Sequence, residues 1–199
     1  KLAFAASALL AAPAFASDCH GIQSDLDRLA CYDKETGLTP ISQTVEPTEE
    51  TGQWSVRTKK SEFKDTTDVF MTLESENTLA CSRFGADQKA TLVLRCSENT
   101  TVAYITTDCH LASGHGGYGK VEYRFDDNPS GKRSFEASTD NRALGLWNGG
   151  KSIPLIKQMF GTDKAIFRFT PFGNNAVTAR FDVSGVEEAI DPLRKACNW

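Results

Sequence analysis

Long apolar runs, histidine and a surplus of basic residues are all scarce in this chain of 199 residues. Beyond residues 2–15, no stretch approaches the roughly 18 apolar residues that a transmembrane helix needs, so we expect no transmembrane segment. The formal net charge is -4 and no basic stripe is present, which argues against nucleic acid as a partner. HExxH, CxxC and GxSxG patterns are missing, so the sequence gives no support for a serine nucleophile elbow.

The first residues have the features of an export signal. Residues 2–15 form an apolar run behind Lys1, and Ala14, Phe15 and Ala16 supply the small-x-small pattern that a signal peptidase recognises. We therefore predict a cleavable signal peptide over residues 1–16 and a mature chain that begins near Ser17.

Six cysteines follow this leader, an even number that indicates disulfides in an exported chain. Fifteen connectivities are possible, so the pairing is argued from local geometry. Cys19 and Cys31 bracket a short helical pattern, and we predict that they pair. Cys81 and Cys96 bracket two strand-like runs, 78–84 and 90–95, for which we predict a cross-hairpin disulfide. Cys109 and Cys197 are then left to pair with each other.

The chain divides into three predicted parts after the leader. Residues 17–36 form a disulfide-stapled helical segment, in which Ser24 is the expected N-cap and Leu26 and Leu29 lie on the apolar stripe. Residues 37–53 are rich in Thr, Glu and Pro and are predicted to be a linker. Residues 54–199 form the main domain, which opens at Trp54.

Closely spaced antiparallel strands are the natural interpretation of the main domain. We predict strands at 68–73, 78–84, 90–96, 101–106, 120–125, 133–137, 165–170 and 176–182. A helix is expected from 152 or 154 to 160, and a second from 186 to 196, capped by Ser184 and kinked or restarted near Pro192. The predicted fold class is α+β: an antiparallel, β-rich, sandwich-like domain with two packed helices and a short disulfide-stapled N-terminal helix.

Two glycine-containing segments imitate ligand-binding motifs. Residues 114–120 match seven positions of a phosphate-binding loop, but Val121 replaces the Ser or Thr that binds magnesium and a strand-like run follows. Asp126, Asn128 and Ser130 imitate half of a calcium loop, yet position 12 is Ala137 where a bidentate Glu is required. We interpret these segments as a flexible loop and a hairpin turn.

Histidine offers the best candidates for chemistry. Asp108, Cys109, His110 and His115 lie close in sequence and have the side chains that zinc prefers. Against a metal site, Cys109 has an expected disulfide partner and a glycine-rich loop holds ligands poorly. Cys109 and His110 are adjacent, so on a strand they point to opposite faces and make a poor nucleophile pair. The sequence predicts no catalytic residues, no metal and no cofactor.

Several segments taken together resemble the VasI family of type VI secretion-associated periplasmic proteins. They are RLACYD at 28–33, Trp54, LVLRC at 92–96, VEYRFD at 121–126, STDNRA at 138–143 and the ending FDVSGVEEAIDPLRKACNW at 181–199. The resemblance implies a Gram-negative periplasmic protein with no assigned catalytic activity, accessory to a secretion apparatus or to envelope maintenance.

These observations predict a non-enzymatic periplasmic accessory protein that works by surface recognition. The expected partner is a protein or peptidoglycan in the cell envelope. The C-terminal helix and a candidate recognition loop, with His110, His115 and Tyr118, are the expected contacts. Two alternatives stay open: an inhibitor or immunity-type protein against a periplasmic hydrolase such as lysozyme, and a metal-assisted hydrolase centred on His110 and His115.

Overall fold

The chain forms two compact units, residues 1–40 and residues 41–199. The computed structural model describes residues 19–22, 28, 31–32, 43–45, 51–61, 64–81, 88–111 and 118–199. The boundaries predicted from the sequence for the signal peptide, the N-terminal segment and the linker stay predictions.

The N-terminal unit contains a disulfide between Cys19 and Cys31, whose Cα atoms lie 5.8 Å apart. A 3-10 turn, η1, covers Cys19–Gly21, and Arg28, Cys31 and Tyr32 are helical. The Arg28 guanidinium donates a hydrogen bond to the Ile22 carbonyl at 3.3 Å. This pairing confirms the first predicted disulfide, whereas Ser24, Leu26 and Leu29 lie outside the described residues.

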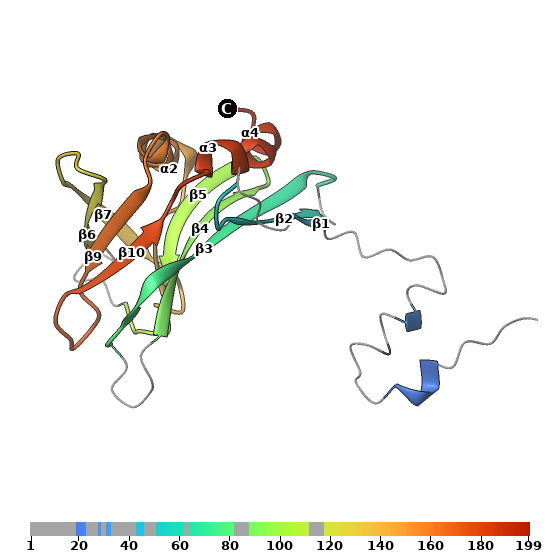
Figure 1. The fold of residues 1–199 in the computed structure, drawn as a ribbon, viewed down its shortest axis with the longest axis horizontal. Coiled ribbons are helices and arrows are strands. Elements are labelled where there is room, and N and C mark those ends of the chain that lie inside the picture. The colour runs from blue at the N-terminus through green and yellow to red at the C-terminus, as the bar shows by residue number, and fades with distance from the viewer. Residues whose placement is uncertain are drawn as a thin grey trace, which may run out of the picture. The chain divides into compact units, whose positions relative to one another are not determined.

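The second unit is built on one antiparallel sheet, in which the described residues contribute ten strands (Figure 1). The strand order across the sheet is β1-β2-β3-β4-β5-β8-β7-β6-β9-β10. The strands are β1 (Gln43–Val45), β2 (Ser55–Lys60), β3 (Thr67–Leu79), β4 (Gln88–Ser97), β5 (Thr100–Thr106), β6 (Tyr118–Phe125), β7 (Gly131–Ala137), β8 (Ala143–Leu146), β9 (Lys164–Phe169) and β10 (Val177–Asp182).

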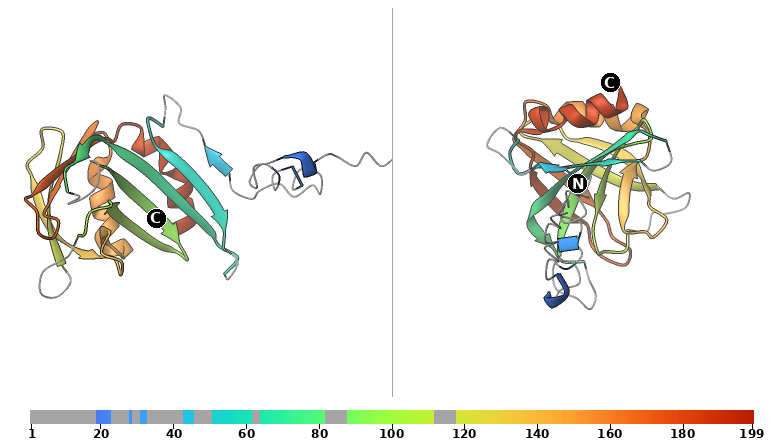
Figure 2. Two further views of the ribbon diagram at one scale, coloured as in Figure 1. Left: turned by 90° about the horizontal axis from the view of Figure 1, so that it is seen from below. Right: turned by 90° about the vertical axis from the view of Figure 1, so that its right-hand side faces the viewer.

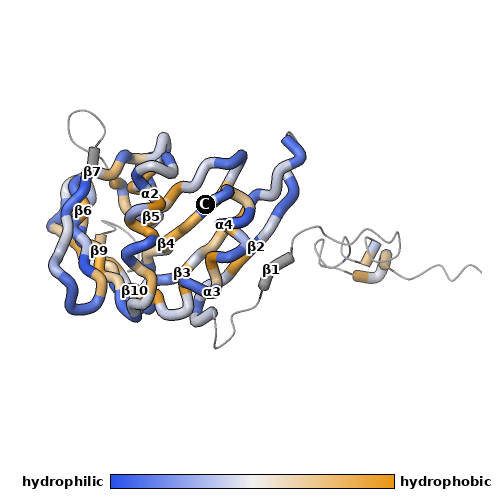
Figure 3. The backbone as a smooth tube through the Cα atoms, turned by 90° about the horizontal axis from the view of Figure 1, so that it is seen from above, coloured by the Kyte–Doolittle hydropathy of each residue, from blue (hydrophilic) through white to orange (hydrophobic). Residues whose placement is uncertain are grey.

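Alternation of apolar and polar residues gives this sheet one buried face (Figure 3). In β9, for example, Ala165, Phe167 and Phe169 are buried, while Lys164 and Arg168 on the alternate positions are exposed. Phe167 packs edge-on against Phe125 and Phe181 from neighbouring strands, with ring centroids 6.0 Å apart in both pairs. The buried face is therefore a continuous core that spans the curled sheet.

The sheet curls because β3 changes its neighbour halfway along. The first half of β3, up to Thr72, pairs with β2. A β-bulge follows. Glu74 and Thr78 are four positions apart on β3, whereas their partners on β4, Thr91 and Lys89, are only two positions apart. Such a bulge bends a strand and increases its twist. Beyond it, the second half of β3 lies against β10, the last strand of the same sheet.

Asn77 joins these two strands with its side chain. Its Nδ2 donates to the Thr178 carbonyl at 3.0 Å, and its Oδ1 accepts from the Arg180 backbone N–H at 2.9 Å. Ser75 supports the bulge, since its buried Oγ donates to the Asn77 carbonyl at 2.6 Å and accepts from the Ala90 N–H at 2.9 Å. The side-chain amide of Asn77 thus substitutes for a backbone ladder and closes the curl.

Three helices cover the sheet on its buried side (Figure 1). They are α2 (Gly149–Ile156), continued by the 3-10 turn η2 (Lys157–Met159), then α3 (Val186–Ala189) and α4 (Asp191–Cys197). The terminal residue Trp199 donates from its indole nitrogen to Thr101 Oγ1 at 2.8 Å and stacks with Lys157 and Arg194. The helices that the structure describes are too short or too polar to cross a bilayer.

The predicted fold class is confirmed: the domain is an antiparallel, β-rich α+β body with packed helices. The two opposed layers come from one sheet that folds over itself. The predicted break near Pro192 is also confirmed, because α3 ends at Ala189 and α4 begins at Asp191. The run predicted at 68–73 lies within β3, which also includes the first two residues of the run predicted at 78–84; residues 82–84 lie outside the described residues, and β1 and β8 were not predicted.

Two predicted helix starts are wrong. The helix α2 begins at Gly149, before the predicted start at 152 or 154, because the Asn148 side chain caps it by accepting the Lys151 N–H at 3.0 Å. Gly185, rather than Ser184, precedes α3 and adopts a left-handed φ of 72°. The Ser184 hydroxyl instead donates to Asp182 at 2.6 Å, so it is not available for the helix.

Two predicted disulfides are also wrong. Cys81 pairs with Cys109, and Cys96 pairs with Cys197, with Cα separations of 5.6 and 5.8 Å. The hairpin register explains the error, because Leu79 faces Gln88 and therefore places Cys81 near the start of β4. Cys96 lies at the other end of that strand, roughly 26 Å away at about 3.3 Å per residue.

Antiparallel pairing of β4 and β5 supplies the correct partner for Cys81. Thr106 at the end of β5 faces Thr91 near the start of β4, so Cys109 arrives beside Cys81. Cys96 is buried on the inner face of β4, against which α4 packs, and meets Cys197 there.

We expect Asn77→Ala to lower the free energy of unfolding by about 1–3 kcal/mol, because it leaves the Thr178 carbonyl and the Arg180 N–H without their partner. Urea unfolding followed by circular dichroism measures the change. Asn128→Ala, in the exposed turn after β6, is the matched control and should shift stability by less than about 0.5 kcal/mol. Equal effects of the two substitutions would show that Asn77 does not close the sheet.

Disulfide mapping distinguishes the observed pairing from the one predicted by sequence. Trypsin alone is insufficient, because it leaves Cys96 and Cys109 in one peptide, residues 96–120. A second digestion with chymotrypsin, which cleaves after Tyr104, separates them. Mass spectrometry of the non-reduced digest should then show Cys81 linked to Cys109 and Cys96 linked to Cys197. A fragment that links Cys81 to Cys96 would contradict the structure.

Candidate functional site

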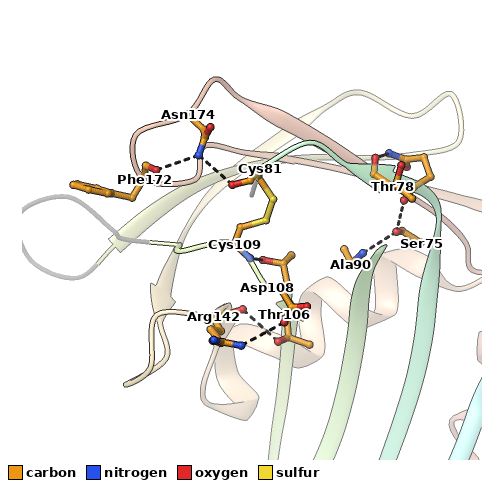
Figure 4. The surroundings of a disulfide bond; sticks show 12 residues. Ser75, Thr78, Cys81, Ala90, Thr106, Asp108, Cys109, Arg142, Phe172 and Asn174 are labelled. Atoms are coloured by element: carbon orange, nitrogen blue, oxygen red, sulfur yellow. Dashed lines mark hydrogen bonds and ion pairs between the residues drawn. A yellow bond between two sulfur atoms is a disulfide. The ribbon is translucent and has the colours of Figure 1, made fainter. Parts of the chain in front are cut away.

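The Cys81–Cys109 disulfide brings three separate segments together at one end of the sheet (Figure 4). Cys81 follows β3, Cys109 and His110 follow β5, and Phe172 lies in the loop between β9 and β10. We call Cys81, Cys109, His110, Phe172 and Asn174 the Phe172 tip.

Phe172 is the prominent side chain of this tip. With 68% of its surface exposed, it is the exposed large hydrophobic residue among the described residues. Its ring meets the His110 ring edge-on, with centroids 5.5 Å apart. Figure 4 shows the Phe172 ring pointing away from the disulfide. The loop therefore presents an apolar surface to solvent that the core does not use.

Backbone and amide hydrogen bonds hold Phe172 in this position. Its N–H donates to the His110 carbonyl at 2.8 Å. The Asn174 side chain donates to the Cys81 carbonyl at 3.2 Å and to the Phe172 carbonyl at 3.3 Å. Gly173 between them has a φ of 69°, a left-handed conformation that other residues rarely adopt. The loop is thus tied to Cys81 and to His110, the residue after Cys109.

The predicted recognition residues are only partly brought together. His110 is exposed and contacts Phe172. Tyr118 begins β6, where it faces Glu136, and its side chain lies outside the described part of the chain. His115 lies outside the described residues altogether. Sequence reasoning missed Phe172, although an aromatic residue between Pro171 and Gly173 in a turn between two strands is a usable signal.

The side chains proposed for zinc or thiol chemistry have other partners. Cys109 forms the disulfide, and Asp108 pairs with Arg142 at 3.4 Å. Within the described ranges, no group of three or more His, Cys, Asp or Glu side chains is arranged to hold a metal ion. In the calcium-like segment, Asp126 accepts the backbone N–H groups of Asp163 and Lys164, so its carboxylate fixes the start of β9.

A hollow of about 290 Å³ lies on the outer face of β6, β9 and β10. Glu122 at its centre is hydrogen-bonded by Lys132 at 2.9 Å and by Arg168 Nε at 2.7 Å. The hydrogen bond from Lys132, followed by that from Arg168, lowers the pKa of Glu122 below its ordinary value. Glu122 already accepts hydrogen bonds from two cations, which makes its carboxylate a weaker candidate for ligand binding.

With this geometry in place, comparison with known proteins decides the family. The model of the family described as "Type VI secretion system VasI, EvfG" matches residues 18–199. The chain belongs to this family. The resemblance seen in the sequence is therefore confirmed over nearly the whole chain. The family is associated with type VI secretion and is not a known enzyme family.

Two further comparisons add little. The solved structure of invasion associated protein b from Bartonella henselae matches with 11% sequence identity and a TM-score of 0.47, covering 79% of this chain and 100% of that one. A search of curated protein sequences gives no match.

We expect loss of the Cys81–Cys109 disulfide to loosen the Phe172 tip. In the double variant Cys81→Ser/Cys109→Ser, the Phe172 amide should exchange with solvent at least about tenfold faster, because local opening costs less without the crosslink. Hydrogen exchange read by NMR measures this rate. The amide of Phe167 in the core of the sheet is the internal control, and an unchanged Phe172 rate would mean that the disulfide does not hold the loop.

Proposed function

We propose that this member of the VasI family is an exported periplasmic accessory protein of type VI secretion that acts by surface recognition, with the Phe172 tip as its protein contact. The observation that carries the proposal is the exposed Phe172 ring, held against His110 on a loop tied to a disulfide. Exposed aromatic residues on pre-organised loops are typical anchors of protein interfaces.

The disulfides support export. All six cysteines of the chain are paired. Such bonds persist in oxidising compartments and are rare where glutathione keeps thiols reduced. The apolar leader predicted at residues 1–16 fits the same location.

The chemistry of the tip supports binding over catalysis. Its cysteines are joined as a disulfide, so neither supplies a thiolate nucleophile. Asp108 beside them is ion-paired with Arg142. The groups that remain at the surface, an imidazole and a phenyl ring, suit contact with a protein.

Site-specific photo-crosslinking tests this function in the intact bacterium. Benzoylphenylalanine, which closely resembles Phe, replaces Phe172 in one strain and exposed Asn128 in a control strain. We expect an adduct with a structural subunit of the type VI apparatus from position 172 and none from position 128. An adduct with a cell-wall hydrolase would instead support the inhibitor alternative, and the absence of any adduct from position 172 would refute contact through the tip.

The matched functional variant is Phe172→Ser. Because the ring is 68% exposed, its loss should change the free energy of unfolding by less than about 0.5 kcal/mol. Affinity for the crosslinked subunit should fall at least about tenfold if the ring is an interface anchor. Isothermal titration with the purified subunit measures the affinity.

A further inference from the structure

The outer face of β2, β3, β4, β5 and β8 carries a second cluster of apolar side chains, separate from the core. Figure 2 shows these strands in front of α2 and α4 when the domain is seen from below, so the helices lie on the opposite side. Cross-strand pairing places Arg57, Phe70, Arg95 and Val102 in one row. The next row contains Ser55, Thr72, Val93, Tyr104 and Gly145.

Two valines on this face are buried, although they lie outside the main core. Val93 and Val102 are only 4% and 2% exposed, although neither belongs to the core cluster. They lie in the rows that hold Phe70 and Tyr104. Together, Phe70, Tyr104, Trp147, Arg57 and Arg95 form what we call the outer platform.

Trp147 lies flat on the sheet in this platform. A Cβ atom on Gly145 would come within 2.8 Å of the Trp147 ring, so the absence of a side chain there lets the ring approach the backbone. The Trp147 and Tyr104 rings lie 5.2 Å apart, and the indole N–H donates to the Glu136 carbonyl at 3.0 Å. The indole is half-buried, with its ring against the backbone at Gly145.

Cations surround these rings. The Arg95 guanidinium lies 5.9 Å from the centre of the Phe70 ring, and its buried Nε has no hydrogen-bond partner. Arg57 is exposed, and among the described residues no ion pair engages it. The acids on the same face are occupied, since Glu74 pairs with Lys89 and Asp68 accepts the Glu98 N–H. This face therefore has a surplus of positive charge at its centre.

A hollow of about 390 Å³ adjoins the platform, lined by Ser55, Arg57, Lys59, Phe70 and Thr72. Its volume falls in the range of small-molecule sites. The lining combines two cations, two hydroxyl groups and one aromatic ring. Its lining residues come from β2 and β3, which pair with each other.

We propose that the outer platform and its hollow bind a carboxylate-bearing glycan, namely peptidoglycan. The C–H faces of sugar rings pack against aromatic rings such as Trp147 and Phe70, and Ser55 and Thr72 supply hydrogen bonds for sugar hydroxyls and amides. Arg57 and Arg95 offer charge-assisted hydrogen bonds to the carboxylates of muramyl groups and their peptide stems. The proposal does not rest on the Phe172 tip, which lies on other loops.

Co-sedimentation with purified sacculi tests the proposal on the mature protein. We expect wild-type protein to sediment with sacculi at low salt and to be released as salt rises, because exposed charges are screened. Chemical amidation of the sacculus carboxylates should abolish sedimentation. Failure of the wild-type protein to bind, or equal binding to amidated sacculi, would overturn the proposal.

Two substitutions, each of which replaces a cation by a carboxylate, locate the site. Arg57→Glu should weaken binding at least about tenfold, because it places a carboxylate against the ligand's own carboxylates. Lys120→Glu, at another exposed cation on β6, is the control and should leave binding unchanged. Equal losses would indicate non-specific attraction to the wall, and no loss from either would place the site elsewhere. Phe172→Ser should not alter sedimentation, which separates this result from the proposed protein contact.

Tryptophan fluorescence gives a second readout that does not depend on charge. Titration with a disaccharide tetrapeptide should change the emission of Trp147, and the change should disappear in Trp147→Phe. Trp54 is fully buried and serves as an unaffected internal chromophore. A neutral chitin oligosaccharide should give no response. Tighter binding to lipopolysaccharide than to the muropeptide would show that the ligand is an acidic glycan other than peptidoglycan, and would overturn the proposal.

Discussion

The side-chain amide of Asn77 keeps the curled sheet of this domain closed. Asn77 connects the second half of β3 to β10, the two strands at which the sheet meets itself. Without a partner there, β10 is an unpaired edge with exposed backbone groups, which is unfavourable in a β-rich protein. The bulge at 74–78 aims Asn77 across the gap, and Ser75 holds the bulge in shape. The bend of β3 and the hydrogen bonds of Asn77 therefore close the sheet together.

Closure of the sheet also determines where the two disulfides of the domain lie. The curl brings the end of β3, the segment after β5 and the β9–β10 loop to the same end of the molecule, where Cys81 and Cys109 join. At the other end, Cys96 fixes α4 to β4 across a sequence separation of 101 residues. Crosslinks of long separation restrict the unfolded chain most, so this bond contributes chiefly to global stability, whereas the first also shapes an exposed loop.

The domain consequently presents two different surfaces. The Phe172 tip is small, apolar and borne on loops, features that suit an anchor for a protein partner. The outer platform is broad, aromatic and cationic and is built on the rigid middle of the sheet, which suits repeated, weaker contacts along a polymer. A protein that engages the cell wall with one surface and a secretion subunit with another would connect the two, in keeping with an accessory part.

Local patterns in the sequence were sufficient for the class of the fold, for most strands, for the break at Pro192 and for the Cys19–Cys31 bond, because each depends on residues close together in the chain. The family was also visible in short segments such as those at 28–33 and 181–199. Pairing of Cys81 and Cys96 was predicted wrongly because proximity in a hairpin depends on register, and register places them at opposite ends of β4. Phe172 and Asn77 gain their roles from strands that are distant in sequence, whereas most of the platform is aligned by the register of consecutive strands. Only the curl of the sheet, a tertiary event, decided that Asn77 would meet β10 and that the loop of Phe172 would meet the Cys81–Cys109 disulfide.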